Sequence, residues 1–206
     1  MTSSPSSSSS DDDRYQVIHA GFTGDSSTAR AGLTHIDAAV RESALRALAR
    51  LQQLTDNELA NALRDPDNNV RRAAVELSVS HHEVDIVEMI NDSDLFVAEM
   101  TAWALGERSN PQDHEVNALI DAVFHHNEAL VREAATAALG SIGDERGLPA
   151  ILHACNDKPA VRRRAVLALA PFEGEEVTAA LETALQDRDW QVRQNAEDML
   201  NPRGYA

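Results

Sequence analysis

The chain has 206 residues, of which 43% are hydrophobic and only eight are aromatic. The apolar content is mainly Ala, Leu and Val, which favours one all-α domain of closely packed helices over a β-sandwich or barrel. The 34 acidic residues outnumber the 18 basic ones and give a formal net charge of −16. This charge argues against nucleic acid or anionic membrane as a partner, because phosphate contacts need clustered lysine and arginine.

The sequence gives no sign of export or of a membrane span. Cys155 is the only cysteine, so no intramolecular disulfide calls for an oxidising compartment. The N-terminus has no basic segment followed by an apolar stretch, and no run of 18 apolar residues occurs. We therefore expect a cytoplasmic protein.

Residues 1–13 form the first distinct segment. They consist mainly of serine, end in Asp11, Asp12 and Asp13, and offer no apolar run with which to join a core. This composition predicts a disordered Ser/Asp-rich tail, with residues 14–206 forming the repeat domain. Two interpretations of the tail stay open, a phosphorylatable acidic switch and a solvated leader.

The rest of the chain repeats itself at a nearly constant interval. Valines recur 27 to 34 residues apart, at Val40, Val70, Val97, Val131, Val161 and Val192. An arginine follows five of these six valines, and a small residue lies four positions after each of them. Three positions before the valine, the residue is acidic in five of the six units. Such self-similarity is typical of repeat architectures.

Each unit predicts a pair of helices. Before the turn, apolar residues at helical spacing, such as Val116, Leu119 and Val123, indicate a first amphipathic helix. A second helix begins near each valine, and the acidic residues of the turn can cap it. We expect six pairs, near residues 25–50, 55–80, 83–107, 113–141, 144–171 and 174–200.

Residues 131–144 carry the clearest copy of the pattern, Val-Arg-Glu-Ala-Ala-Thr-Ala-Ala-Leu-Gly-Ser-Ile-Gly-Asp. They resemble HEAT-like repeats of the short type found in phycobilisome lyase-related proteins, and the resemblance extends over residues 25–200. It implies a right-handed, armadillo-like α-solenoid of six helix pairs, with the second helices on its concave side. Stacked repeats form an open curved surface, which implies a non-catalytic adaptor or scaffold that binds another protein.

The arginines that follow the valines admit two roles, a basic ladder for phosphate or a structural ladder. They are Arg41, Arg71, Arg132, Arg162 and Arg193. Each begins a second helix beside the acids of its own and the adjacent turn, which favours a structural Asp/Arg ladder along one edge. Arg163 and Arg164 exceed what the ladder needs, and we expect both to be free for an acidic partner.

An apolar strip with an acidic rim is predicted on the concave surface of the third to fifth units. Its residues lie three and six positions after the valines, and the rim acids lie two positions after them. They are Met100, Trp103, Ala134, Ala137 and Leu167 in the strip and Glu99 and Glu133 in the rim.

Such a patch suits a partner peptide or helix with apolar anchors and basic flanks. The third unit also breaks the repeat rule, because Ala98 stands where the other units have the ladder arginine. The alternative is that Trp103 fills space against a distorted neighbour, because the repeat spacings on its two sides are the shortest and the longest.

The eight histidines raise the question of metal chemistry. His-Glu dipeptides are similar to those of the deoxyhypusine hydroxylases, HEAT-like enzymes with a di-iron centre. In that family the dipeptides lie in the second helices just after Val-Arg, where this chain has other residues. His82 and His114, in loops between repeats, remain candidates for a weak metal site.

Other chemistry lacks a sequence signal, because the chain has no phosphate-binding loop, no paired cysteines and no nucleophile beside a suitable base. We expect no cofactor and no catalytic residue. The alternative function is a HEAT-like enzyme, an oxidoreductase similar to deoxyhypusine hydroxylase or a bilin lyase or isomerase.

Overall fold

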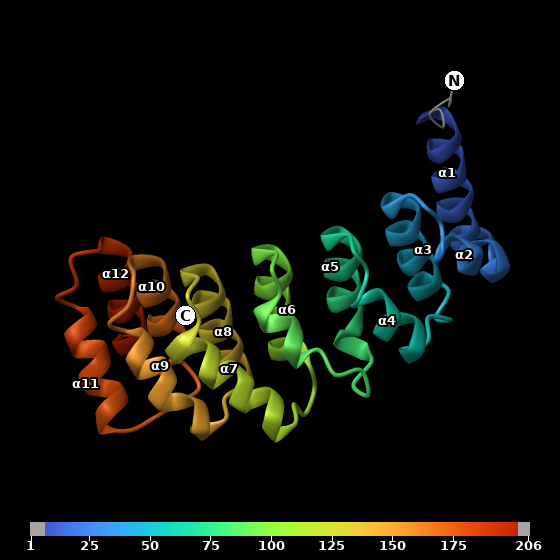
Figure 1. Cartoon of the computed structure of the whole chain (residues 1–206). Coiled ribbons are helices and arrows are strands. Elements are labelled where there is room, and N and C mark those ends of the chain that lie inside the picture. The colour runs from blue at the N-terminus through green and yellow to red at the C-terminus, as the bar shows by residue number, and fades with distance from the viewer. Residues whose placement is uncertain (1–6, 202–206) are drawn as a thin grey trace, which may run out of the picture. The chain divides into compact units, whose positions relative to one another are not determined.

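The computed structural model of the chain describes residues 7–201, and all regular secondary structure in this range is helical (Figure 1). Twelve α-helices and three short 3₁₀-helices follow one another between these residues, without a strand. The predicted all-α class is therefore confirmed. Residues 1–6 of the predicted tail lie outside the described residues.

The chain divides into two compact units, and the first ends at Ile86. Its helices are α1 (Ser7–Thr23), α2 (Ser26–Gly32), α3 (Ala38–Arg50), α4 (Asp56–Ala62), α5 (Asn68–Leu77) and the 3₁₀-helix η1 (Ser78–Ser80). Helices α2 and α4 are the first helices of two pairs, and they pack against their second helices α3 and α5. Helix α3 also packs between α1 and α5.

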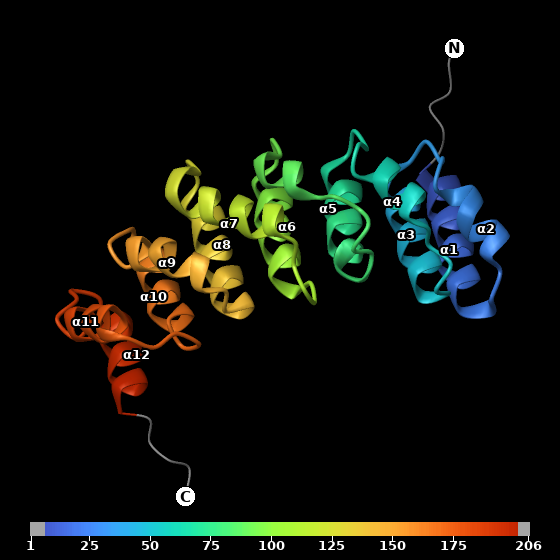
Figure 2. The ribbon, with the colours of Figure 1, turned by 90° about the horizontal axis from the view of Figure 1, so that it is seen from below.

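The second unit begins at Val87. It contains the 3₁₀-helix η2 (Val87–Asn91), α6 (Leu95–Glu107), α7 (Asp113–His125), α8 (Ala129–Ile142), η3 (Glu145–Gly147), α9 (Leu148–Ala154), α10 (Pro159–Ala168), α11 (Glu175–Ala184) and α12 (Trp190–Leu200). The second helices α6, α8, α10 and α12 lie side by side in both views (Figure 1, Figure 2), each packed against the next.

The recurring valines lie at the centre of this packing. In the second unit Val97, Val131, Val161 and Val192 are all buried. The small residues one helical turn later are buried as well, namely Thr101, Ala135, Ala165 and Ala196. Because these side chains are short, the second helices approach one another closely and exclude water from the contacts between them.

The acid three positions before the valine caps the second helix. Asp37, Asp67, Asp94 and Asp189 are the N-cap residues of α3, α5, α6 and α12. Each carboxylate accepts a hydrogen bond from a backbone N–H in the first turn, as Asp189 does from Gln191 at 2.9 Å. A cap of this kind contributes about 1 kcal/mol and complements the positive end of the helix.

The predicted tail differs from the structure over residues 7–13, which form the first turns of α1. Ser10 donates a hydrogen bond to Asp37, and Asp13 lies 3.3 Å from His35, so both residues contact the next helix pair. Packing of Val17 and Ala20 holds the helix against α3. Composition alone therefore placed the start of the folded domain too late.

The third repeat has a short first helix. Its segment before the turn is the 3₁₀-helix η2, which has five residues where the other units have an α-helix. The valine spacing leading into this unit is the shortest in the chain, so few residues are left for a first helix. Ile90 of η2 is nevertheless buried, and η2 packs against α6 and α7 as a first helix would.

Gly140 lies at a close approach between two second helices. A Cβ atom at this position of α8 would lie 2.7 Å from both the Cα and the Cβ of Ala168 in α10. Backbone atoms cannot move aside as a flexible side chain can. The glycine is thus required by the contact between the two helices rather than by its own backbone conformation.

We predict that Gly140→Ala destabilises the protein although alanine is the better helix former. Overpacking at a tight contact costs about 1–3 kcal/mol, which exceeds the helix-propensity gain of about 1 kcal/mol. Chemical denaturation measures the difference. Ser141→Ala, at the exposed neighbouring position of the same helix, is the control and should be neutral or slightly stabilising. Equal stability of Gly140→Ala and wild type would show that α8 and α10 separate easily.

Candidate binding surface on helices α6, α8 and α10

Equivalent positions of three consecutive second helices present apolar side chains to solvent. Trp103 on α6 is 44% exposed and Leu167 on α10 is 45% exposed, with the half-buried Ala137 between them on α8. Met100 and Ala134, one turn earlier, are half-buried too. We call these five residues the α6–α10 strip. Apolar side chains that share one row of helices, rather than being scattered singly, mark a candidate binding surface.

Two glutamates from neighbouring helices lie beside the strip. Glu99 on α6 is half-buried, and within residues 7–201 it makes no hydrogen bond or ion pair. Burial, and secondly the negative charge of Glu133 on α8, raises the pKa of Glu99 above its ordinary value. The site therefore holds a carboxylate whose charged form is poorly compensated, so a nearby cation would be favourable.

The two arginines that follow Arg162 are both engaged. Arg163 Nη1 donates to Gln191 Oε1 at 2.6 Å, and its Nε lies 3.5 Å from Asp189, so it joins α10 to α12. Arg164 Nη2 is 3.8 Å from Glu133, and Arg164 is exposed. The expectation that both are free for an acidic partner is therefore wrong for Arg163. Arg164 instead belongs to the charged rim beside the strip.

Three of the ladder arginines make paired hydrogen bonds to the carboxylate of the following turn. Arg132 Nε and Nη2 donate to Asp157 at 2.6 and 2.8 Å, and Arg162 binds Asp187 at 2.7 Å through both nitrogens. Arg41 pairs with Asp65 in the same way. The remaining nitrogen of each arginine donates to backbone carbonyls of its own turn. Two-point contacts of this kind fix both distance and orientation between repeats.

Arg71 and Arg193 of the ladder also contact main-chain oxygens. Arg71 Nη1 donates to the carbonyl of Asp65 at 2.9 Å, and Arg193 Nη1 donates to the carbonyl of Asp187 at 2.7 Å. In each case the arginine closes the turn that precedes its own helix. Together with the paired carboxylates of Arg41, Arg132 and Arg162, these contacts favour the structural role of the ladder over phosphate binding.

The paired carboxyls titrate below their ordinary range. Hydrogen bonds from Arg132 lower the pKa of Asp157, and those from Arg162 lower the pKa of Asp187. At Asp65 burial is the largest influence and raises the pKa, but the bonds from Arg41 and from a backbone N–H together outweigh it, so the pKa is lowered there too. All three acids are therefore ionised at neutral pH, as the ladder requires.

A histidine replaces the ladder acid in the turn that follows Ala98. Asp187 accepts a backbone N–H from two residues further on, and His126 Nδ1 accepts the N–H of Glu128 in the same way at 3.1 Å. This turn needs the acceptor but no counter-charge, because no ladder arginine precedes it. The sequence contained the signal: His126 stands five positions before Val131, as Asp187 stands five positions before Val192, the last of the recurring valines. Sequence reasoning missed this role.

Comparison with known proteins places these helix pairs in a family. The sequence profile of HEAT repeats matches residues 84–160 and 116–201, which together cover more than half of the chain. The chain belongs to the HEAT repeat family. No curated protein sequence matches this HEAT repeat protein.

Solved structures support the same fold for this HEAT repeat protein. YibA of Escherichia coli is 15% identical, with a TM-score of 0.63 over 97% of this chain and 76% of that one. A designed armadillo repeat protein is 17% identical, with a TM-score of 0.54 over 84% of this chain and 97% of that one. At these identities the likeness shows the fold, and the solenoid class predicted from the repeats is thereby confirmed.

The histidines of this HEAT repeat protein do not assemble a metal site in the described part of the chain. Among residues 7–201 no group of three or more His, Cys, Asp or Glu side chains is placed to hold an ion. His82 and His114 belong to different compact units. Glu115, next to His114, is buried and accepts a hydrogen bond from the buried Arg108.

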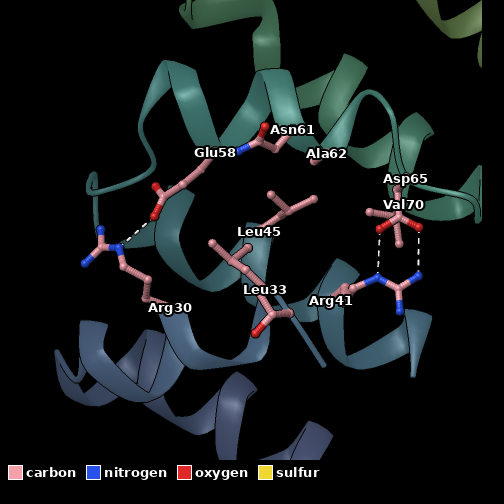
Figure 3. A pocket seen from close by; sticks show the side chains of 10 residues that line it. Arg30, Leu33, Arg41, Leu45, Glu58, Asn61, Ala62, Asp65 and Val70 are labelled. Carbon is pink, nitrogen blue, oxygen red and sulfur yellow. Dashed lines mark hydrogen bonds and ion pairs between the residues drawn. The ribbon is translucent and has the colours of Figure 1, made fainter. Parts of the chain in front are cut away.

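A pocket of about 290 Å³ lies in the first unit of this HEAT repeat protein (Figure 3). Leu33 and Leu45 form its apolar floor, between the pairs that Arg30 makes with Glu58 and Arg41 makes with Asp65. Both arginines are thus neutralised by carboxylates. The pocket is a gap between successive helix pairs, and the two ion pairs span it.

The lone cysteine is unsuited to catalysis. Burial raises the pKa of the Cys155 thiol to about 11, so the reactive thiolate is scarce at neutral pH.

None of the helices between residues 7 and 201 has the length and apolarity that crossing a bilayer requires.

Proposed function

We propose that this protein is a non-catalytic adaptor or scaffold that binds a peptide or helix along the α6–α10 strip. The observation that carries the proposal is the exposure of Trp103 and Leu167 at equivalent positions of α6 and α10, the two helices that pack on either side of α8. Aromatic side chains set among smaller apolar ones are frequent anchors of protein interfaces. The methionine beside Trp103 can adapt its shape to an incoming side chain.

The rim supports a partner with basic flanks. Glu99 is half-buried without a cation of its own and feels the charge of Glu133. A lysine or arginine placed by the partner beside Glu99 would relieve this repulsion, and it would gain from a partly desolvated contact. The net charge of −16 would also attract a basic partner over longer distances at moderate salt.

Two finer assignments accompany the proposal. We assign the repeats to the short phycobilisome lyase-related type, on the motif of residues 131–144 that contains Val-Arg and ends in Gly-Asp. We place the protein in the cytoplasm, which suits a chain with one unpaired cysteine.

Selection from a displayed library of random 16-residue peptides tests the proposal. The wild-type protein should enrich sequences that combine a large apolar residue with nearby lysine or arginine, and soluble copies should bind in solution. The Trp190→Glu variant, altered at a 65% exposed tryptophan outside the strip, should select the same sequences. Enrichment of acidic sequences, or of none, would refute a strip that binds basic apolar segments.

We predict opposite effects of Glu99→Gln on stability and on binding. The charged form of Glu99 is disfavoured by burial and by Glu133, so removing the charge should leave the melting temperature unchanged or raise it. The same change should weaken binding of a selected basic peptide several-fold, because its cation loses a partner. Calorimetry and titration report the two effects separately. A fall in melting temperature with unaltered affinity would give Glu99 a purely structural role.

A further inference from the structure

Helix α1 exposes an apolar stripe that the rest of the first unit does not cover. Tyr15 is 68% exposed, Ile18 41% and Phe22 67%. Their spacing of three and four residues places them on one side of the helix. The opposite side packs on α3, where Val17 and Ala20 are buried. Among the described residues, the stripe is therefore the solvent-facing side of α1.

Opposite charges stand at the two ends of this stripe. Asp11 and Asp12 are exposed in the second turn of α1, and the nearby Arg14 donates a hydrogen bond to Ser43 of α3 at 3.1 Å. At the other end, the guanidinium of Arg50 from α3 lies over the Phe22 ring, 4.2 Å from its centroid. Arg50 is exposed as well. The stripe thus runs from an acidic end through three apolar side chains to a basic end.

We infer that α1 is a dimer contact, in which the stripe packs antiparallel on the same stripe of a second copy of the chain. With Ile18 near the two-fold axis, Tyr15 of each copy lies opposite Phe22 of the other. Asp11 then lies toward the Arg50 end of the other copy, so both ends are complementary at once. The antiparallel arrangement also sets the helix dipoles favourably.

A second copy fits this surface better than an unrelated segment does. A partner with one sign of charge would match one end of the stripe and oppose the other, whereas the antiparallel copy matches both. The interface is small, because a helix of 17 residues is about 25 Å long. We therefore expect a weak dimer whose population rises with protein concentration against the repulsion of the net charge.

Disulfide trapping tests both the contact and its direction. Ile18→Cys, oxidised mildly at micromolar concentration, should form a covalent dimer at least ten times faster than wild type, in which Cys155 is the only thiol. Burial raises the pKa of the Cys155 thiol to about 11, so Cys155 reacts slowly at pH 8. Thr23→Cys, exposed on the same helix but off the stripe, is the matched control and should react slowly.

Mixing Tyr15→Cys protein with Phe22→Cys protein fixes the orientation. The antiparallel contact predicts that the mixed disulfide exceeds either homodimer, and a parallel contact predicts the reverse. Sedimentation of Ile18→Glu should show less dimer than wild type at equal concentration, with Gln16→Glu as the charge-matched control. Equal trapping at positions 18 and 23, or a wild type that stays monomeric up to millimolar concentration, would overturn the inference.

Discussion

Replacing Trp103 by glutamate should weaken binding of a basic, leucine-containing peptide at least 30-fold while leaving the fold intact. Truncating an interface anchor typically costs 2 kcal/mol or more, which corresponds to about this factor. The introduced charge would in addition join Glu99 and Glu133 and oppose any apolar anchor of the partner. Trp103 is 44% exposed, so helicity should be retained and the melting temperature should fall by no more than about 4 °C.

The result distinguishes the two interpretations of Trp103. Trp190→Glu, at the start of α12, introduces the same charge in place of the same residue type outside the strip, and it should bind the peptide like wild type. If Trp103→Glu lowered the melting temperature by 10 °C or more, Trp103 would be a packing residue of the short third repeat. A loss of binding in both variants would point to nonspecific attraction by the acidic surface.

Replacing Arg162 by alanine should cost about 3 kcal/mol of unfolding free energy. Arg162 is buried, holds Asp187 through two hydrogen bonds and also donates to the carbonyl of Asp157. Removing one partner of such a pair leaves a carboxylate with poor access to water. Arg46→Ala is the control, because Arg46 pairs with Glu76 on the exposed side and should contribute about 0.5 kcal/mol or less.

The Arg162–Asp187 pair also predicts how the stability lost in Arg162→Ala depends on pH. Asp187 has a lowered pKa in the folded state, so its pairing stabilises the protein above the unfolded value near 4 and is lost as pH falls through the folded value. Denaturant titrations should therefore show the gap between wild type and Arg162→Ala narrowing below about pH 4. A gap independent of pH would assign the loss to packing of the arginine stem rather than to charge.

Second helices could be predicted from the sequence because the same residues serve the same physical purpose in most units. Val131 and its equivalents are buried at the contacts between second helices, and in four units an aspartate three positions before the valine caps the helix. Buried valines and capping aspartates recur at fixed spacing, so they can be recognised in the sequence. The sequence of α1 lacks the Val-Arg pair, so its Ser/Asp composition suggested a tail although its inner residues pack on α3.

Contacts between repeats were less predictable. Asp189 and Asp187 stand two residues apart, yet the first caps its own helix and the second receives Arg162 from the preceding unit. A sequence does not show which of two nearby acids an arginine reaches. For the same reason Arg163 seemed surplus to the ladder, whereas its bond to Gln191 depends on where α12 lies.

The strip could be proposed from the repeat register alone, since positions six residues after successive valines face the same way. Its electrostatics could not. The uncompensated charge of Glu99 depends on its burial and on the nearby Glu133. Pairing of Glu133 with Arg164 further depends on side-chain reach between α8 and α10. These distances follow from how closely the helices pack and not from the order of residues.

Fluorescence titration tests the central claim most directly, because the chain has only two tryptophans. In the Trp190→Phe variant, the emission of Trp103 should shift to the blue and saturate as a selected basic, leucine-containing peptide is added. The Trp103→Phe variant, which reports on Trp190, should show no shift, and neither should wild type with a twin peptide carrying glutamate for lysine. An unshifted Trp103, or equal shifts at both tryptophans, would contradict binding along the α6–α10 strip.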